Sequence, residues 1–213
     1  MTDFPETWAV VLAAGRAKRL GGGKLLLPLG GCPVVMHVLA AYRAAGDIPV
    51  VAVIRPEADA LARLLHSSGA RVVVNPHPER GMYSSLCVGV AALPATTGAF
   101  FVHPADIPLV TPATLSELRV RLCANPERAV AVPTFLGRRG HPPLLAGRLI
   151  STVLAGAGQD GLRGVLQGFR EQTELVECDD AGVLLDMDTP DDYRALQQLV
   201  TGMPVTCAAA CAG

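Results

Sequence analysis

The sequence predicts an α/β fold in which a mostly parallel sheet is covered by helices on both faces. Apolar, β-branched runs typical of strands recur at residues 8–13, 49–54, 71–75, 99–103, 129–133 and 183–187. Segments with helical apolar spacing separate most of them, at residues 33–45, 57–67, 81–92 and 112–123. Because parallel neighbours need a crossover between them, this alternation indicates βαβ units with ligands at the carboxyl ends of the strands.

Length and composition favour one folded domain. The chain has 213 residues, half of them hydrophobic, and a net charge of −1 without an acidic or basic block. A sizeable core is therefore expected, and binding to nucleic acid or to a membrane surface is not. The longest apolar runs are strand-sized and the N-terminus carries Asp3 and Glu6, so we expect neither a membrane span nor a signal peptide, and a cytoplasmic location.

The C-terminal segment and the cysteines carry no predicted chemistry. Residues 202–213 lack charge and periodicity, so the domain is expected to span residues 1–201 with a flexible tail after it. The six cysteines form no C-x-x-C pair, which indicates neither a zinc site nor a disulfide framework. Free thiols are therefore the expectation for Cys32, Cys87, Cys123, Cys178, Cys207 and Cys211.

The first predicted strand runs directly into a glycine-rich loop. The strand ends in Leu12, Ala13, Ala14 and Gly15, and the loop carries four cations and the glycines of residues 21–23. Small residues leave backbone N–H groups accessible to an anion. Arg19 offers a planar fork of donors and Lys24 a point charge, so together they suit a pyrophosphate group. The loop predicts a phosphate cradle, against the alternative of a flexible glycine turn with solvated charges.

Two better-known phosphate loops do not fit this segment. A P-loop needs Ser or Thr after its lysine, but Leu25 follows Lys24. A dinucleotide-binding fingerprint needs a second glycine two residues after Gly15 and an acid closing the second strand, which here ends at Arg55.

Acidic residues follow two of the predicted strands. Asp106 ends a buried run, and the next helix already has Thr111 as its N-cap. Asp186 and Asp188 lie two apart on a predicted strand and so face the same side. Magnesium binds proteins through one or two carboxylates plus substrate phosphates, so we expect Mg²⁺ between Asp106 and Asp188, with Asp186 as a further candidate ligand. Thr189, Pro190 and Asp192 instead predict a helix start, with Asp191 as a further first-turn acid.

Five motifs in this order resemble the MobA-like nucleotidyltransferases, and most closely the molybdenum cofactor cytidylyltransferases, up to about residue 200. They are Leu12-Ala13-Ala14-Gly15 with Arg19, Gly21 and Lys24; Asn75-Pro76 with Gly81, Ser84 and Ser85; Asp106-Ile107-Pro108; Gly140-His141-Pro142; and Asp186-Met187-Asp188-Thr189-Pro190. The resemblance implies a single Rossmann-like nucleotidyltransferase domain.

The resemblance also implies an activity, the transfer of CMP from CTP to molybdopterin with release of pyrophosphate. It assigns the triphosphate to the first loop, including Arg19 and Lys24, and the metal to Asp106 and Asp188. It places the base and ribose near Asn75, Gly81, Ser84 and Ser85, and the pterin near Gly140, His141 and Pro142. A transient contact with a recipient molybdoenzyme is a further implication.

The resemblance assigns the base from Ala14, and the Gly140-His141-Pro142 turn and the Asp186-Met187-Asp188-Thr189-Pro190 ending also resemble the cytidylyl branch. The guanylyl branch of this family typically reads Leu-Ala-Gly-Gly where this chain has Ala14, and the extra methyl favours cytosine. The alternatives are a nucleotidyltransferase that uses GTP or a sugar phosphate, and a noncatalytic protein that delivers cofactor. His141 has two interpretations, a substrate contact or a hydrogen-bonded turn residue. Structural roles are expected for His77 and His103, and no chemical role for His37 and His66.

Overall fold

A computed structural model describes residues 5–15, 23–156 and 161–201 of the chain. The predictions for Arg19, for Gly21 and for the tail at 202–213 lie outside these residues. Within the described residues, no helix is long and apolar enough to cross a membrane.

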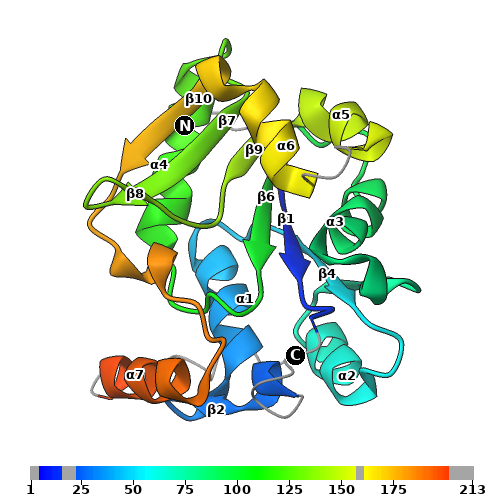
Figure 1. The fold of residues 1–213 in the computed structure, drawn as a ribbon, viewed down its shortest axis with the longest axis vertical. Coiled ribbons are helices and arrows are strands. Elements are labelled where there is room, and N and C mark those ends of the chain that lie inside the picture. The colour runs from blue at the N-terminus through cyan, green and yellow to red at the C-terminus, as the bar shows by residue number, and fades with distance from the viewer. Residues whose placement is uncertain (1–4, 16–22, 157–160, 202–213) are drawn as a thin grey trace.

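The centre of the fold is a mostly parallel sheet with the strand order β10-β7-β9-β6-β1-β4-β5, in which β8 pairs with β7 (Figure 1). Only β8 and β9 run antiparallel to their neighbours. The strands are β1 (Thr7–Leu12), β4 (Val50–Ile54), β5 (Arg71–Val74), β6 (Ala99–Pro104), β7 (Val130–Phe135), β8 (Arg138–Arg139), β9 (Leu144–Ala146) and β10 (Thr173–Glu177). The carboxyl ends of the parallel strands therefore lie along one edge.

Helices cover both faces of the sheet, as predicted. One face carries α1 (Val34–Ala44), α2 (Asp59–Ser67) and α4 (Pro112–Ala124), and the other carries α3 (Met82–Ala91), α5 (Ile150–Ala155) and α6 (Gly161–Gly168). The arrowheads of β1 and β6 point toward the edge where α7 (Pro190–Val200) and the hairpin of β2 (Pro28–Leu29) and β3 (Cys32–Pro33) lie (Figure 1). Short 3₁₀ turns complete the fold: η1 (Lys24–Leu26), η2 (Pro78–Arg80), η3 (Gly147–Leu149), η5 (Arg170–Gln172) and η6 (Ala181–Leu184).

The two helical layers bury alternate residues of the same strands. In β1, Ala9 and Val11 pack into the core under α1, whereas Val10 and Leu12 pack into the core under α3. Successive side chains of a strand point to opposite faces, so a strand buried on both faces must be apolar throughout. This is why the continuous apolar runs of the sequence identify the central strands.

Two elements at the margin of the sheet differ from the prediction. The apolar run at 183–187 is not a strand, because Asp180 caps the 3₁₀ turn η6 by accepting from the Gly182 N–H, and irregular chain follows. The strand β10 instead occupies the sheet edge, where Val176 is its one buried residue and Leu175 and Glu177 are exposed, so it has no continuous apolar run. The expectation of free thiols is confirmed for Cys87, Cys123 and Cys178 and is wrong for Cys32, which is disulfide-bonded.

Helix α3 approaches the sheet closely at a glycine, which gives a test of the packing. A Cβ at Gly89 would lie 2.4 Å from Val10 Cγ1 and 2.7 Å from Val53 Cγ2. Gly89→Ala is therefore expected to lower the free energy of unfolding by about 1–3 kcal/mol, although alanine is the better helix former. Urea unfolding measures this, with Gly168→Ala as the control, since a Cβ there meets no atom within 4 Å. Equal unfolding midpoints for the two variants would contradict the packing.

Candidate functional site

The candidate site lies at the carboxyl ends of β1 and β6, two neighbouring strands whose connections lead to opposite sides of the sheet. After β1 the chain leads to β4 on one side, and after β6 it leads to β7 on the other. In open α/β sheets, ligands bind in the crevice at such a reversal of strand order. Hydrogen bonds join the strand ends there: the Ala105 N–H, after β6, donates to the Leu12 carbonyl of β1 at 3.1 Å, and the Ala13 N–H, after β1, donates to the Val53 carbonyl of β4 at 2.8 Å.

Three sequence-predicted residues meet at this edge around one ammonium group. Lys24 Nζ donates to Asp106 Oδ2 at 2.7 Å, to Asp188 Oδ1 at 3.0 Å and to the Met187 carbonyl at 2.9 Å. The lysine side chain is 9% exposed, whereas those of Asp106 and Asp188 are 27% and 53% exposed. The cation thus lies on the buried side of the two carboxylates.

The electrostatics keep this lysine charged. Burial lowers the pKa of Lys24, but the hydrogen bonds and charges of Asp106 and Asp188 outweigh it, so the pKa lies above its ordinary value. Within the whole sequence only two cations are lysines and sixteen are arginines. The position therefore uses a compact ammonium with three donors in a chain that otherwise relies on guanidinium groups.

Local backbone structure positions Lys24, Asp106 and Asp188. Gly23, at φ 72°, adopts a left-handed conformation that glycine tolerates and starts the turn η1, in which Lys24 and Leu25 are buried. Asp106 follows β6, and its carbonyl accepts from the Met187 N–H at 2.9 Å, which ties the two acidic segments together. Asp188 precedes α7, whose predicted capping box between Thr189 and Asp192 is confirmed.

Asp180 holds the second acidic segment in place, and sequence reasoning missed it. Its Oδ2 accepts from the Thr111 N–H and from the hydroxyls of Thr111 and Thr114, the last at 2.7 Å. Its Oδ1 accepts from the Gly182 N–H at 2.9 Å. The carboxylate is buried and fully partnered, so it fixes the start of the segment that carries Asp188. The only sequence signal was an acid before a turn glycine.

The donor set suits a divalent cation that shares its ligands with a substrate. Asp106, Asp188 and the Met187 carbonyl present hard oxygen atoms around one positive charge, which the ammonium supplies. No cluster of three or more His, Cys, Asp or Glu side chains with metal-binding geometry occurs among the described residues. Asp186 has no contact with Lys24 among the described hydrogen bonds, and the strand that was to align it with Asp188 does not form. The strand-based argument for Asp186 is therefore wrong.

Gly140, His141 and Pro142 lie next to the acids. The Gly140 N–H donates to the Pro133 carbonyl and the His141 N–H to the Val183 carbonyl, and the His141–Pro142 peptide is cis. A Cβ at Gly140 would lie 2.5 Å from Val183 Cγ2, so glycine is required for this close approach. Burial lowers the pKa of His141, opposed by the charges of Asp106 and Asp186. The His141 Nδ1 is buried and has no hydrogen-bond partner among the described residues.

The residues predicted near the base and ribose also lie together, at the end of β5. Asn75 Nδ2 donates to the Ser84 and Ser85 hydroxyls, both at 2.9 Å, and its Oδ1 accepts from the His77 N–H. Gly81, at φ 91°, is the N-cap of α3. The amide of Asn75 is thus engaged within the protein, where it fixes the turn that starts α3.

A pocket lies between the first loop and the turn after β4. Its lining includes Ala13, Gly15, Gly23 and Lys24 from the first loop and Arg55 from the end of β4. A Cβ at Gly15 would meet nothing within 4 Å, so the backbone there is open to a ligand. Leu12 and Ala14 are buried against the sheet.

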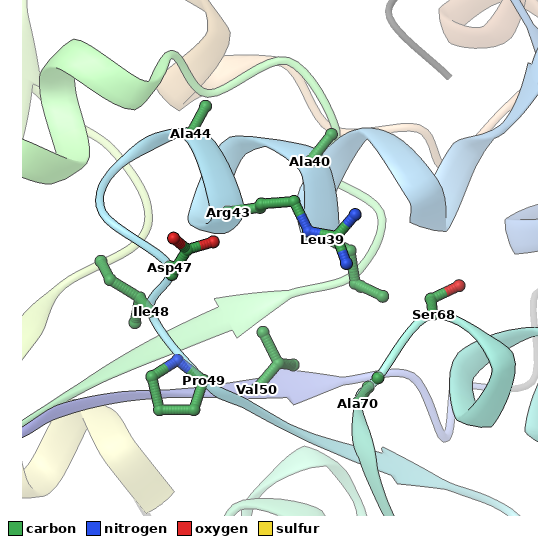
Figure 2. A pocket seen from close by; sticks show the side chains of 11 residues that line it. Leu39, Ala40, Arg43, Ala44, Asp47, Ile48, Pro49, Val50, Ser68 and Ala70 are labelled. Atoms are coloured by element: carbon green, nitrogen blue, oxygen red, sulfur yellow. The ribbon is translucent and has the colours of Figure 1, made fainter. Parts of the chain in front are cut away.

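A second hollow lies at the opposite edge of the sheet, away from these residues (Figure 2). It is formed by the last turns of α1, the start of β4 and the residues before β5. Apolar side chains such as Leu39 and Val50 line it together with the polar Arg43, Asp47 and Ser68 (Figure 2). It shares no lining residue with the pocket at the carboxyl ends of the strands.

His103 supports the loop that carries Asp106, as the structural prediction for it required. Its Nε2 donates to the Ile107 carbonyl and its Nδ1 accepts from the Tyr42 hydroxyl, both at 2.9 Å. Burial lowers the pKa of His103 from 6.5 to about 4. His37 Nε2 lies 2.8 Å from the Leu29 carbonyl, and its lack of a chemical role stays a prediction.

The His103 pKa predicts acid sensitivity. The pKa of His103 is lower in the folded state than in the unfolded state, so its neutral form favours folding. Its contribution to the free energy of unfolding is fully present above pH 6.5 and is lost as the pH falls toward about 4, by about 3 kcal/mol in total. Urea unfolding at pH 7 and pH 5 measures the loss. His103→Gln should remove most of this pH dependence, whereas His66→Gln on the exposed face of α2 should leave it unchanged. A His103→Gln variant as acid-sensitive as the native chain would contradict the assignment.

Comparison with known proteins agrees with the fold. The sequence matches the profile of the MobA-like NTP transferase domain over residues 9–177. The nicotine blue oxidoreductase of Paenarthrobacter nicotinovorans is 32% identical, with 92% of this chain and 98% of that protein covered. The 2-C-methyl-D-erythritol 4-phosphate cytidylyltransferase of Streptomyces coelicolor is 35% identical, with 91% of this chain and 74% of that protein covered.

Two further similarities bear on nucleotide and metal. The protein named "Probable molybdenum cofactor guanylyltransferase" of Haloferax mediterranei is 28% identical, with 88% of this chain and 91% of that protein covered. The crystal structure of Rv0371c from Mycobacterium tuberculosis H37Rv in complex with manganese has a TM-score of 0.75 at 27% identity, covering 92% and 99% of the two chains. The predicted fold class is confirmed.

Proposed function

Because this chain belongs to the MobA-like NTP transferase domain family, we propose that it transfers CMP from CTP to the terminal phosphate of molybdopterin carrying molybdenum. The coarser activity, nucleotidyl transfer, follows from the family. The observation that carries the proposal is the convergence of Lys24, Asp106 and Asp188 at the carboxyl ends of the central strands. A cation and two carboxylates at that place suit a triphosphate with its metal.

The reaction needs positioning and charge neutralisation more than proton transfer. An oxygen of the pterin phosphate forms a bond to the α-phosphorus of CTP, the bond from that phosphorus to the bridging β-phosphate oxygen breaks, and pyrophosphate leaves. A phosphate monoester has a second pKa of about 6, so it is mostly dianionic at neutral pH and needs no general base. The work left to the protein is alignment and stabilisation of the leaving group.

Each candidate residue takes a role in this reaction. Lys24 and Arg19 stabilise the departing pyrophosphate, and the open backbone at Gly15 admits the phosphates. Asp106 and Asp188 hold a divalent cation, which supplies charge neutralisation at the α-phosphate when bound. Magnesium is the proposed ion, and the manganese complex of Rv0371c supports the binding of a divalent cation. Asp186 remains a candidate ligand.

The pterin is assigned to the side of the site that carries the cis peptide. His141 has a buried Nδ1 without a partner among the described residues, and it lies near Asp106 and Asp186. A buried nitrogen left open in this way is suited to a polar atom of a substrate. The proposal therefore keeps Gly140, His141 and Pro142 as the pterin contact, and Gly81, Asn75, Ser84 and Ser85 as the turn beside base and ribose.

CTP is the proposed nucleotide, on the methyl group of Ala14. That side chain is buried just after the end of β1. The Streptomyces coelicolor cytidylyltransferase supports this choice, and the Haloferax mediterranei protein favours GTP instead. Continuous measurement of pyrophosphate release, with molybdopterin as acceptor and CTP or GTP as donor, tests the proposal.

The outcomes of this assay separate the competing functions. Acceptor-dependent pyrophosphate release from CTP supports the proposal, and faster release from GTP would assign the guanylyl reaction. Release with a sugar phosphate alone would indicate another acceptor class. No release from either nucleotide would leave a cofactor-delivery role or a redox activity, the latter suggested only by the name of the Paenarthrobacter nicotinovorans relative. We also propose a transient contact with a recipient molybdoenzyme and a cytoplasmic location.

A further inference from the structure

Lys24 is bound to the same oxygens that the proposed function gives to a metal ion. Its ammonium has three N–H donors, and the structure matches them with Asp106 Oδ2, Asp188 Oδ1 and the Met187 carbonyl at 2.7, 3.0 and 2.9 Å. A lysine whose only role was to bind phosphate would not need hydrogen bonds to two carboxylates and a carbonyl. Lys24 therefore occupies the two carboxylates before any phosphate is bound.

We propose that Lys24 competes with free divalent cations for Asp106 and Asp188, and releases these carboxylates when a nucleoside triphosphate arrives. Metal and nucleotide would then enter the site together. The inference rests on the proposed function, since that function supplies the triphosphate. It adds a second role to Lys24, which guards the carboxylates before it stabilises the leaving group.

The burial of Lys24 explains why a free metal ion competes poorly. To take the carboxylates, the ion must displace an ammonium that is only 9% exposed on its side chain. A cation left in that position without its anions loses its compensating charges, and an unpaired buried charge is strongly unfavourable. The ammonium and the divalent ion would also repel each other across the same oxygens.

A triphosphate removes both obstacles. It offers new anionic oxygens to the lysine and further ligands to the metal, so the exchange leaves no charge unpaired. The more exposed sides of Asp106 and Asp188 face outward, where an incoming metal–nucleotide complex first meets them. The flexible four-carbon stem of lysine suits such a movement, and arginine, with its rigid fork, does not.

Binding of Mn²⁺ alone tests the inference without any catalytic step. Electron paramagnetic resonance or calorimetry of the full chain, without nucleotide, should give a Kd about tenfold tighter for Lys24→Met than for the native protein. Lys24→Met combined with Asp188→Asn should bind weakly again, because the gained affinity requires the carboxylate. Arg55→Met is the matched control: it removes a cation from the same pocket that has no contact with the carboxylates in the described hydrogen bonds.

A second measurement on the native chain does not depend on any variant folding. A nonhydrolysable CTP analogue should tighten Mn²⁺ binding about tenfold or more, because it draws Lys24 away from the carboxylates. Equal Mn²⁺ affinities for the native and Lys24→Met proteins would overturn the inference, as would Mn²⁺ binding that ignores the analogue. Failure of CMP transfer to molybdopterin would instead overturn the proposed acceptor, and the comparison of free Mn²⁺ affinities would stand unchanged.

Discussion

Replacement of Lys24 by alanine is expected to lower kcat for CMP transfer by a factor of about 10² to 10³, the usual effect of removing a group that stabilises charge in the transition state. Negative charge accumulates on the pyrophosphate as the bond to the α-phosphorus breaks, and Lys24 is the described cation that lies at the strand ends beside both carboxylates. The pterin is assigned to Gly140, His141 and Pro142, none of which contacts the Lys24 ammonium in the described hydrogen bonds, so its KM should change by no more than about twofold. Steady-state kinetics with varied molybdopterin separates the two parameters.

The control for this experiment must exclude a simple loss of structure. Without the ammonium, Asp106 and Asp188 face each other unpaired, which destabilises the local fold in the absence of metal. Circular dichroism and unfolding midpoints, measured with and without Mg²⁺, show whether the variant is folded under assay conditions. An intact fold with native kcat would remove Lys24 from the mechanism.

Asp106→Asn is expected to be the second severe change, with a loss of about 10² or more in kcat and no recovery at high Mg²⁺. The amide keeps the shape of the side chain but removes the charge that a divalent cation and Lys24 both require. The assay is CMP transfer across a magnesium titration. A variant activated by magnesium in the native way would argue against Asp106 as a ligand.

The remaining two acids provide an internal comparison. Asp188→Asn removes a carboxylate that contacts Lys24, whereas Asp186→Asn removes one that does not. The first should resemble Asp106→Asn, and the second should lose far less activity. Equal losses for the two variants would show that the metal site extends to Asp186.

The sequence predicts the central strands because they are buried on both faces, and it predicts the helices that cover them because their apolar residues recur at helical spacing. β1, β4 and β6 are apolar on both faces, and the predicted helices match α1 to α4 within two residues at each end. The edges are harder because one side faces solvent. The strand β10 has only two apolar residues, Leu175 and Val176, so no apolar run marks it in the sequence, while the buried Val183 and Met187 belong to a turn and to irregular chain.

The sequence predicts which residues belong to the site, but not the hydrogen bonds between them. Lys24 and Asp106 follow parallel strands, whose carboxyl ends meet at one edge, so they could be selected from the sequence. Asp188 is predicted at the end of a further strand, which does not form, and irregular chain before α7 brings it to Lys24 instead. The pairing of the three residues could not be predicted, because it joins residues 82 and 164 positions apart. The same holds for Asp180, whose partners Thr111 and Thr114 lie far away in the chain. Asp180 lies in no recognised sequence motif, so its role in positioning the segment with Asp188 could not be predicted.

The proposed transfer of CMP to a molybdopterin phosphate by this nucleotidyltransferase is tested by the mass of the pterin product. The protein is supplied with Mg²⁺, molybdenum-loaded molybdopterin, and CTP and GTP at equal concentration, and the pterin products are identified by mass spectrometry. We expect molybdopterin cytosine dinucleotide as the main product, formed in amounts equal to the pyrophosphate released. A guanine dinucleotide as the main product, or an unmodified pterin, would contradict the proposal.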